Sequence, residues 1–382
     1  MRSTDVAIVG GGLAGLYAAS QLESRGIDYQ LFDAKPLFGG RVAGVPVALG
    51  KGVQGASGDV VESGEQIGVF APQFYDVGPA WIFPHHLLMQ ELVMRMGLCL
   101  FEQHASGDVL YQFENIKEPR RISNTQTQLL YRIKSGSYSL IRALLSNINS
   151  ENLHAKHRVT SVTKQSDRWR VNFVANAKES QITCQHIIFA LPPRIIARDF
   201  SKASWMNNVL QQQLGYSQTW MAAQAKVLVT YPTPFWREKG LSGQVFSQVG
   251  PIVEIHDACC SQTQGFALFG FIGIPATQRL QLSQKALKQA CLKQLADIFG
   301  HDAYRFEKCY IKDWASDTEI CTGQDQSEGS RHPQIDMQAC ENALLNENLY
   351  FAGSEFASAE AGYLEGALIA ANAALLKLEG RL

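Results

Sequence analysis

Four residues near the start of the chain have the types and spacing that hold a dinucleotide. Gly10, Gly12 and Gly15 form the pattern G-x-G-x-x-G, and Asp33 follows at the distance that the pattern requires. The first glycine allows a tight turn, the second lets the backbone approach a pyrophosphate, and the third lets a helix pack closely on a strand. The carboxylate of Asp33 can accept hydrogen bonds from both ribose hydroxyls. The four residues therefore predict a dinucleotide-binding site.

Three secondary-structure elements must position these residues. DVAIVGG is typical of a buried strand, residues 11–23 carry apolar side chains at helical spacing, and YQLFDA reads as a second strand that ends at Asp33. Gly26 ends the helix, because glycine tolerates the left-handed cap conformation. Leu13 and Ala14 begin the helix, whose free N–H groups and partial positive charge attract phosphate. The strand–helix–strand order predicts a parallel sheet.

The remaining chain is long enough for a second domain, because 382 residues exceed one ordinary core. Apolar patterns predict helices at 86–96, within 131–146, at 283–299 and at 362–378. Strands are predicted at 158–162, 169–174, 186–190, 225–231, 266–274 and 348–353. We expect loops or hairpins over 43–70, and a loop with short elements over 315–342.

The composition is that of a folded, nearly neutral protein. Hydrophobic residues make up 46% and charged residues 18%, and 34 Lys and Arg balance 35 Asp and Glu. This balance argues against a nucleic-acid partner, which attracts a basic surface. No segment has the length and hydrophobicity of a membrane span. Eight scattered cysteines, without a C-x-x-C pair or zinc spacing, and the absence of a leader predict reduced thiols, no metal site and a cytoplasmic location.

The segment after Asp33 distinguishes between the possible dinucleotides. DAKPLFGGRV resembles the E-A-x-x-x-x-G-G-R motif of the flavin-containing amine oxidase superfamily, with Asp33 in place of glutamate. The resemblance implies FAD and places five residues beside it, namely Ala34, Gly39, Gly40, Arg41 and Val42. An arginine at this point makes charge-assisted hydrogen bonds to a pyrophosphate.

Further segments resemble the same superfamily in the same order along the chain. YDVGPAWIFP resembles the segment that passes the flavin ring, and LYFAGSEFASAEAGYLEGALIAANAA matches the C-terminal block nearly throughout. With the shorter match IIFALPP, these segments imply cofactor contacts at Gly78, Pro79, Ala80, Trp81, Val159, Ala190, Gly353, Glu355, Gly362, Tyr363 and Leu364. The helix that begins near Gly362 would direct its positive end at the flavin.

Three residues carry the catalytic part of the resemblance. In AKVLVTYPTPFW, Lys226 resembles the monoamine oxidase lysine that holds a water against the reactive flavin nitrogen. Tyr363 corresponds to one aromatic wall beside the amine, and we assign the other wall to Trp314. The tyrosine expected downstream of that tryptophan is absent, and Cys321 stands in its neighbourhood. We expect FAD to be bound non-covalently, because the spacing around Cys321 differs from that of relatives that tether their flavin.

The resemblance implies an α/β fold with two interleaved domains. A Rossmann-like FAD-binding domain with three layers and a parallel sheet is expected at 1–80, 132–215 and 343–382. An α+β substrate domain with a mixed or antiparallel sheet is expected at 81–131 and 216–342, with its helical part (82–130) reduced. The predicted function is oxidation of a small amine by hydride transfer to FAD, with O2 as the electron acceptor.

Two alternatives to this function remain open. Another flavin chemistry on the same fold, such as a desaturase or a renalase-like dihydronicotinamide oxidase, would keep every FAD motif. An accessory flavoprotein that acts on a partner protein would suit a reduced substrate domain. Amino acids and simple amines are not separated as substrates, because no arginine stands in a context that marks it as a carboxylate clamp.

Overall fold

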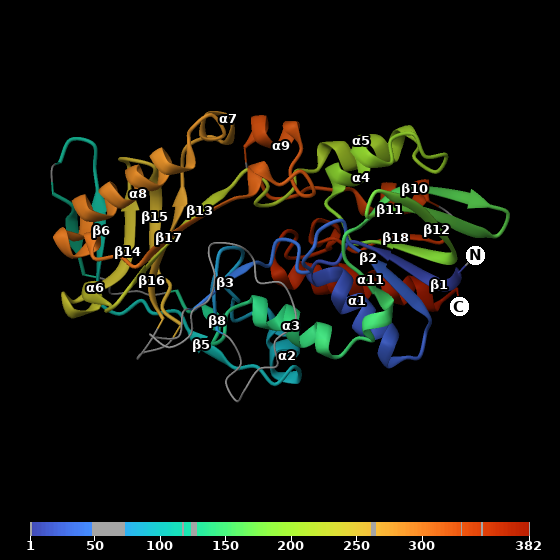
Figure 1. Ribbon diagram of the computed structural model, residues 1–382, viewed down its shortest axis with the longest axis horizontal. Coiled ribbons are helices and arrows are strands. Elements are labelled where there is room, and N and C mark those ends of the chain that lie inside the picture. Colours follow the sequence, from blue (N-terminus) through green and yellow to red (C-terminus); the bar gives the residue numbers. More distant parts are fainter. Residues whose placement is uncertain are drawn as a thin grey trace.

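The chain forms two large β-sheets at opposite ends of an elongated molecule (Figure 1). The computed structural model describes residues 2–47, 73–116, 118–123, 128–260, 265–329, 331–344 and 347–381. Both chain ends lie beside the first sheet (Figure 1), and the chain leaves that sheet twice to build the second one and returns to it each time. Each helix in the described part of the chain is too short or too polar to span a lipid bilayer.

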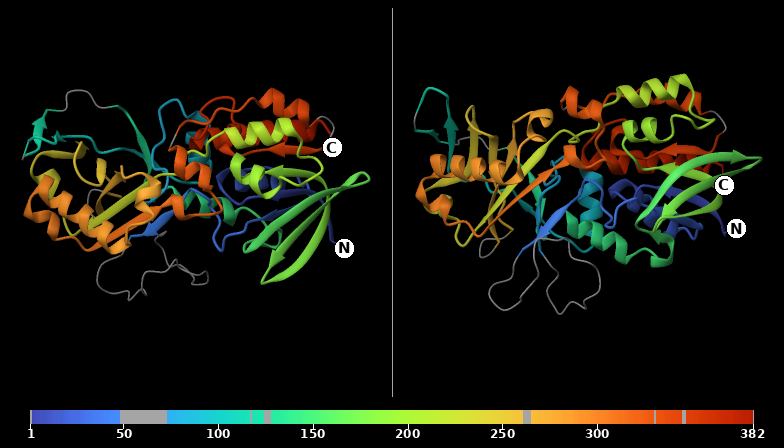
Figure 2. Two further views of the ribbon diagram at one scale, coloured as in Figure 1. Left: turned by 90° about the horizontal axis from the view of Figure 1, so that it is seen from above. Right: turned by 45° about the horizontal axis from the view of Figure 1, so that its top comes forward.

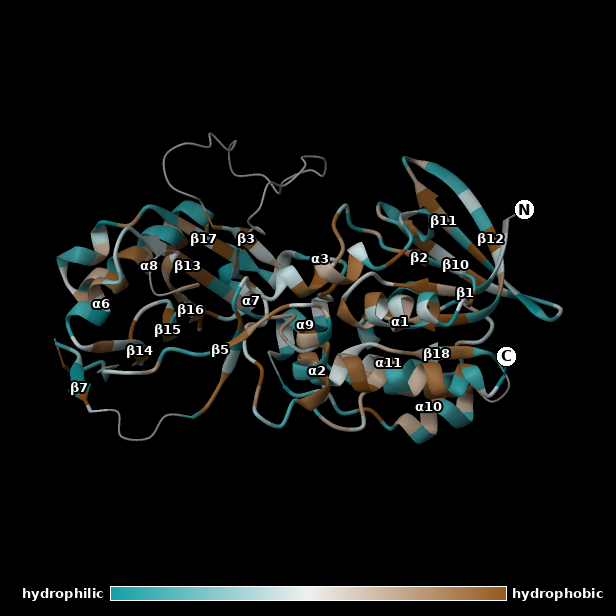
Figure 3. Cartoon of the chain, turned by 90° about the horizontal axis from the view of Figure 1, so that it is seen from below, coloured by the Kyte–Doolittle hydropathy of each residue, from teal (hydrophilic) through white to brown (hydrophobic). Residues whose placement is uncertain are grey.

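The first sheet has a parallel centre and an antiparallel edge. Its strands are β1 (Arg2–Val9), β2 (Tyr29–Phe32), β9 (Leu153–His154), β10 (His157–Gln165), β11 (Arg168–Ala175), β12 (Lys178–Phe189) and β18 (Leu349–Phe351). Their order is β10-β11-β12-β1-β2-β9, and β18 pairs with the end of β12. The pairs of β1, β2, β9, β12 and β18 are parallel. The antiparallel strands β10–β12 project from the body (Figure 2), and their outer ends are hydrophilic (Figure 3).

Helices cover both faces of this sheet. Successive side chains of a central strand point to opposite faces, and the apolar side chains on each face are buried by helices. On β1, Val6 and Ile8 pack in one hydrophobic cluster with α1, α2, α3 and α11, while Ala7 and Val9 pack in another with α4, α5 and α10. The helices are α1 (Leu13–Ser24), α2 (Leu87–Arg95), α3 (Tyr138–Ser146), α4 (Pro193–Asp199), α5 (Asn208–Tyr216), α10 (Met337–Ala343) and α11 (Leu364–Glu379). The expected three-layer, Rossmann-like arrangement is confirmed.

The second sheet is mixed, as expected. Its strands are β6 (Asp108–Gln112), β7 (Arg120–Ile122), β13 (Ala225–Tyr231), β14 (Leu241–Ser247), β15 (Ile252–Asp257), β16 (Phe266–Ile272) and β17 (Lys308–Asp313). Their order is β17-β13-β16-β15-β14-β6-β7, with one parallel pair between β14 and β6. Helix α8 (Gln284–Phe299) covers the face that carries Val227 and Val229. The opposite face, with Lys226 and Leu228, is therefore turned away from α8.

Short elements complete the chain. They are β3 (Gly44–Pro46) paired with β4 (Phe74–Asp76), β5 (Leu100–Glu102) paired with β8 (Tyr131–Ile133), the helices α6 (Phe235–Glu238), α7 (Ala276–Arg279) and α9 (Gly323–Glu328), and the 3₁₀ turns η1 (Ser150–Asn152), η2 (His301–Tyr304), η3 (Trp314–Ser316) and η4 (Ser354–Phe356). All eight cysteines are described, and each is a free thiol.

Several expectations about local structure need correction. The sequence patterns did not reveal strands β6, β7, β14 and β15 or helices α4 and α5. The strand pattern is hidden in β7, which is exposed at every residue, and in β14, which contains polar residues. The expected strand at 266–274 ends at Ile272. The reduced helical content expected over 82–130 needs no correction, since α2 is the one helix in the described part of this range. The loop or hairpin expected over 43–70 includes β3, and its remainder from residue 48 lies outside the described residues.

The two sheets lie within the two sets of segments that the sequence assigned to separate domains. The first sheet draws on 2–32, 153–189 and 349–351, and the second on 108–122 and 225–313. We propose these segment sets as the FAD-binding and substrate-binding domains.

Candidate functional site

A cavity of about 540 Å³ extends from the first sheet to the second. It begins where four parallel strands end in one row, since Val9 pairs with Phe32 and Phe189, and Phe189 pairs with Phe351. Ligands of open α/β sheets bind in the crevice at the carboxyl ends of the strands. The predicted residues that line the cavity are Gly10, Gly12, Leu13, Ala14, Asp33, Ala34, Gly39, Gly40, Arg41, Val42, Gly78, Pro79, Ala80, Trp81, Val159, Ala190, Lys226, Gly353, Gly362, Tyr363 and Leu364.

The glycines of the first turn have different structural roles. A Cβ atom on Gly15 would lie 1.9 Å from the carbonyl oxygen of Gly10, so Gly15 is required by packing and does not line the cavity. A Cβ atom on Gly12 would meet no protein atom closer than 3.9 Å. Gly12 is therefore not required by the protein's own packing, and the space beside it belongs to the cavity. This is the arrangement expected where a ligand approaches the backbone.

Asp33 holds the turn and also faces the cavity. Its Oδ2 accepts a hydrogen bond from the N–H of Gly11 at 2.7 Å, and its Oδ1 accepts one from the N–H of Lys35 at 2.7 Å. Burial raises the pKa of the Asp33 carboxyl, and the two backbone donors oppose that rise. A carboxylate offers about four acceptor sites, so capacity remains for ribose hydroxyls.

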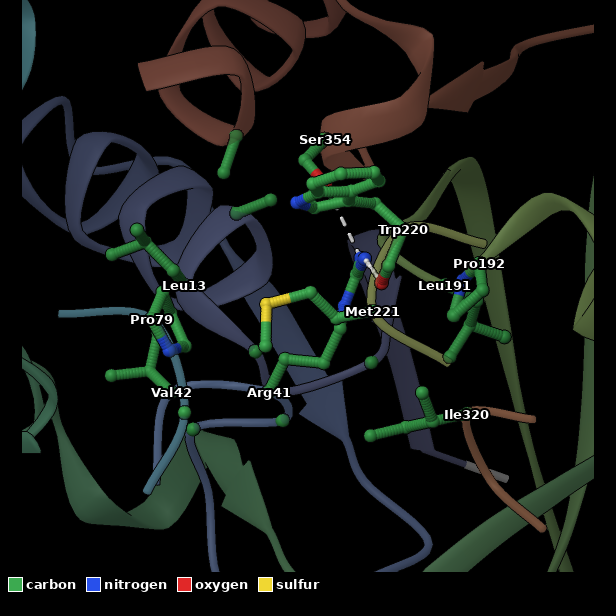
Figure 4. Close-up of a pocket in the computed structure, with 18 of the residues that line it drawn as sticks. Leu13, Arg41, Val42, Pro79, Leu191, Pro192, Trp220, Met221, Ile320 and Ser354 are labelled. Carbon is green, nitrogen blue, oxygen red and sulfur yellow. Dashed lines mark hydrogen bonds between the residues drawn. The ribbon is translucent and has the colours of Figure 1, made fainter. Parts of the chain in front are cut away.

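Arg41 joins the two ends of the chain at the cavity wall. Both of its terminal nitrogens contact the carboxylate of Glu355, one of them at 2.9 Å. The guanidinium also donates to the Trp220 carbonyl at 3.0 Å and to Ser354 Oγ at 3.2 Å (Figure 4). Glu355 is buried and lies behind Arg41 without lining the cavity. Its direct contact with FAD stays a prediction, whereas its contact with Arg41 positions that side chain.

Two helix N-termini open onto the cavity. Helix α1 starts after Gly12 and helix α11 starts after Tyr363, and neither residue caps its helix through a side chain. Both capping residues line the cavity. The first N–H groups of each helix are thus available to a ligand, and each helix end carries partial positive charge.

Lys226 is buried in the cavity wall on strand β13. Its Nζ donates to the backbone carbonyls of Gly78 at 2.8 Å and Asp76 at 3.2 Å, and lies 4.0 Å from the ring centre of Phe269. The pKa of Lys226 is lowered to about 7, chiefly by burial and to a smaller extent by the nearby Arg132, while Asp76 opposes the shift. The amine can therefore change its charge near neutral pH.

Aromatic side chains surround this end of the cavity. Trp81 packs against Phe269 and Phe271, with ring centres 5.6 and 6.2 Å apart. Tyr363 meets Phe83 edge-on at 5.7 Å, and Trp220 lies 6.3 Å from it. All six of these aromatic residues line the cavity.

Trp314, the second predicted aromatic wall, does not line the cavity. It is 1% exposed and packs in a separate cluster with Ala222, Ile320 and Cys321, while Lys312 lies 4.2 Å from its ring centre. The structure therefore does not bring Trp314 together with Tyr363. Trp220 is the tryptophan that stands beside Tyr363.

Several cavity residues were not predicted from the sequence, namely Phe83, Trp220, Met221, Gln224, Val253, Glu254, Phe269 and Phe271. The segment just before the strand of Lys226 contains Trp220, Met221 and Gln224. Their closeness in sequence to Lys226 could have indicated that they lie near it in the cavity. Val253 and Glu254 lie on β15, which the sequence pattern did not reveal.

His85, His86 and Glu360 bring three potential metal ligands within 4.8 Å of one another. His86 Nδ1 accepts a hydrogen bond from the N–H of Phe83 at 3.3 Å, which leaves the ring proton on Nε2, 3.1 Å from a Glu360 oxygen. The group thus satisfies itself by hydrogen bonding, and we assign no metal to it.

The residues present fit FAD. Gly12 leaves room that protein atoms do not fill, two uncapped helix ends and Arg41 offer positive charge to phosphates, and Asp33 retains acceptor capacity for a ribose. The cavity continues from this end to Lys226 and the aromatic side chains, as a long two-ring cofactor requires.

Comparisons with known proteins agree with this description. A family model described as flavin containing amine oxidoreductase matches residues 114–374, and one described as an NAD(P)-binding Rossmann-like domain matches residues 8–92. The probable flavin-containing monoamine oxidase A of Dictyostelium discoideum is 22% identical over an alignment of 466 positions, gaps included, that covers 95% of each chain. The putrescine oxidase of Kocuria rosea is 29% identical over 167 residues, 41% of this chain and 30% of that protein.

Solved structures share the fold along the whole chain. A putrescine oxidase variant superposes with a TM-score of 0.77 at 16% identity and covers 100% of both chains. The cyclohexylamine oxidase from Brevibacterium oxydans superposes with a TM-score of 0.76 at 18% identity and covers 99% of both chains.

Proposed function

The chain belongs to the flavin-containing amine oxidoreductase family, and on this premise we propose that it oxidises an amine with FAD as cofactor and O2 as electron acceptor. Membership of the family implies FAD. The observation that carries the proposal is the position of Lys226, a buried amine in the wall of the cavity beside Gly78 and a group of aromatic rings. FAD, when bound, supplies the acceptor for a hydride from the carbon next to the amine nitrogen and passes two electrons on to O2.

The aromatic walls select the reactive form of the substrate. An amine must be neutral to give up hydride, because the protonated form has no lone pair to assist the departure. Trp81, Phe271 and Tyr363 form an apolar surface, which disfavours the ammonium form by desolvation. Loss of hydride leaves an iminium, which water hydrolyses to a carbonyl compound and ammonia or a smaller amine.

Lys226 has two functions in this proposal. Gly78 and Asp76 hold its Nζ through two hydrogen bonds, so one proton or a lone pair remains to orient a water molecule. In its protonated form, Lys226 also supplies positive charge where oxygen accepts its first electron. With a pKa of about 7, both forms are populated near neutral pH.

The relatives support an amine as substrate. The names of the similar proteins include monoamine oxidase, putrescine oxidase and cyclohexylamine oxidase. A relative named L-amino acid dehydrogenase in Synechocystis, 28% identical over 176 residues, keeps amino acids in the test set.

Anaerobic stopped-flow mixing tests the proposal. The FAD-loaded protein is mixed with primary amines, diamines, L-amino acids, a dihydronicotinamide and a polyene, and loss of the oxidised flavin absorbance is recorded. We expect reduction by at least one amine and recovery of the absorbance with O2. Reduction by the dihydronicotinamide or the polyene alone would refute the proposal in favour of another flavin chemistry.

A further inference from the structure

The face of the second sheet that borders the cavity carries one row of three side chains. Lys226 on β13 pairs with Phe271 on β16, and Phe271 pairs with Glu254 on β15. Paired residues on neighbouring strands point to the same face. Lys226, Phe271 and Glu254 all line the cavity. With neighbouring strands about 4.8 Å apart, the backbones of Lys226 and Glu254 are separated by about 10 Å.

A β-bulge turns this part of β15 toward the cavity. The register between β15 and β16 shifts between Ile252 and Glu254, so Val253 is left without a partner and both Val253 and Glu254 reach the cavity. Bulges re-aim side chains and are common beside functional sites. The carboxylate at this position is thus a consequence of local backbone geometry.

One of the two carboxylate oxygens of Glu254 has a hydrogen-bond partner. Its Oε1 lies 2.5 Å from His256 Nε2, and the His256 ring stacks on Phe269 at 5.3 Å. Within the described residues, no hydrogen-bond partner is seen for Oε2. A contact to one oxygen orients a carboxylate and leaves its other oxygen able to accept a hydrogen bond from a ligand.

The charges of the cavity favour a cation at this position. Most charged cavity residues lie at the dinucleotide end, and they are Asp33, Lys35, Arg41, Arg158, Asp199 and Glu319. On the face of the second sheet the charged lining residues are Lys226 and Glu254. Burial reduces the positive charge that Lys226 carries near neutral pH, and Glu254 is the acidic residue of this face.

We propose that Glu254 binds a second, positively charged group of the substrate, so that the protein prefers amines with a cationic group at the opposite end of the molecule. The inference rests on the proposed function, because it names the substrate class of the same site. One end of the substrate lies neutral beside Lys226, Phe271 contacts the carbon chain, and Glu254 receives the cationic end.

Two matched ligand pairs test this subsite. Calorimetry compares binding of hexylguanidine and 1,6-diguanidinohexane, which differ by one cationic group, to the FAD-loaded protein. Anaerobic flavin reduction compares n-hexylamine with 1,6-diaminohexane. We expect at least tenfold tighter binding of the double cation and at least a tenfold higher kcat/KM for the diamine. Glu254→Gln should bring both ratios within about twofold. Glu307→Gln, at an exposed acid outside the cavity, should keep both ratios.

The possible failures are distinguishable. If n-hexylamine reduces the flavin but neither ratio exceeds twofold in the unaltered protein, the subsite is overturned and amine oxidation stands. Ratios that persist in Glu254→Gln, or that vanish equally in Glu307→Gln, also overturn it. If no amine reduces the flavin, amine oxidation fails, whereas the guanidine pair still shows whether Glu254 binds a cation.

Discussion

The Nζ of Lys226 donates a hydrogen bond to the backbone carbonyl of Gly78 at 2.8 Å, across 148 positions of the chain. This bond joins the second sheet to the segment that lines the cavity beside the dinucleotide site. A buried lysine that bonds only to backbone carbonyls and aromatic faces has no directly bonded counter-charge, which is why its pKa falls. The same position that suits catalysis therefore costs stability.

The first prediction concerns oxygen. Lys226→Met keeps the length of the side chain and removes its charge and hydrogen bonds, so reoxidation of the reduced protein by O2 should slow at least tenfold. Stopped-flow mixing of the reduced protein with oxygenated buffer measures this rate. Lys312→Met is the matched control, because Lys312 pairs with Lys226 from β17 but does not line the cavity. An unchanged rate in Lys226→Met would remove Lys226 from the oxygen reaction.

The second prediction concerns the pH dependence of stability. The unfolded chain holds the Lys226 proton up to pH about 10.5 and the folded protein only up to pH about 7. Between these values the unfolded state binds more protons, so the lysine's contribution to the free energy of unfolding becomes more favourable as pH rises. Lys226→Met should therefore be most stabilising relative to the unaltered protein at pH 6, and the difference should shrink by pH 10. Chemical denaturation at several pH values checks this, and a difference independent of pH would contradict the lowered pKa.

The third prediction separates two glycines of one motif. Gly12→Val adds atoms in the space beside the backbone that the protein leaves open, so FAD content should fall steeply while the Tm stays near that of the unaltered protein stripped of FAD. Gly15→Ala places a Cβ 1.9 Å from Gly10 O, so the Tm of the stripped protein should fall by several degrees, as an overpacking cost of about 1–3 kcal/mol predicts. Equal effects of the two substitutions on Tm would contradict these assignments.

The dinucleotide end was predictable because its signals are local. Asp33 follows a strand, and Gly12 and Tyr363 each precede a helix, and the types of these elements are visible in short windows. The parallel strands bring the ends of β1 and β2 into one row. The far end of the cavity was not predictable in the same way. Glu254 reaches the cavity through a register shift between two strands, and strand register depends on tertiary pairing that the local pattern does not reveal.

The two tryptophans illustrate the same limit. Trp314 occupies the expected place in the order of motifs, yet the turn η3 directs its side chain into the cluster with Ala222 and Ile320. Trp220 belongs to no motif and reaches the cavity because its carbonyl and N–H are held by Arg41 and Glu355. Contacts between segments far apart in sequence therefore decide which tryptophan faces the cavity.

The fourth prediction concerns the attachment of the cofactor. Cys321 does not line the cavity, its Sγ contacts the Thr322 carbonyl at 3.4 Å, and burial raises the pKa of its thiol to about 12. A buried neutral thiol is a poor nucleophile, so acid precipitation should release yellow flavin into the supernatant. Cys321→Ser should retain the same flavin content. Flavin that stays with the pellet, and is lost from it in Cys321→Ser, would establish a covalent link.

The fifth prediction tests which aromatic residues contact the substrate. Tyr363 lines the cavity and lies 5.7 Å from Phe83 and 6.3 Å from Trp220, so Tyr363→Ala should raise the KM for an amine about tenfold. Trp314→Phe should lower the Tm, because it shortens a fully buried side chain, but should leave KM within about twofold. Steady-state kinetics and thermal unfolding of the two FAD-loaded variants measure both effects. If Trp314→Phe raised KM as much as Tyr363→Ala at a temperature where both variants are folded, Trp314 would have to contact the substrate in the working enzyme, and the cavity wall would include the second aromatic side chain that the sequence predicts.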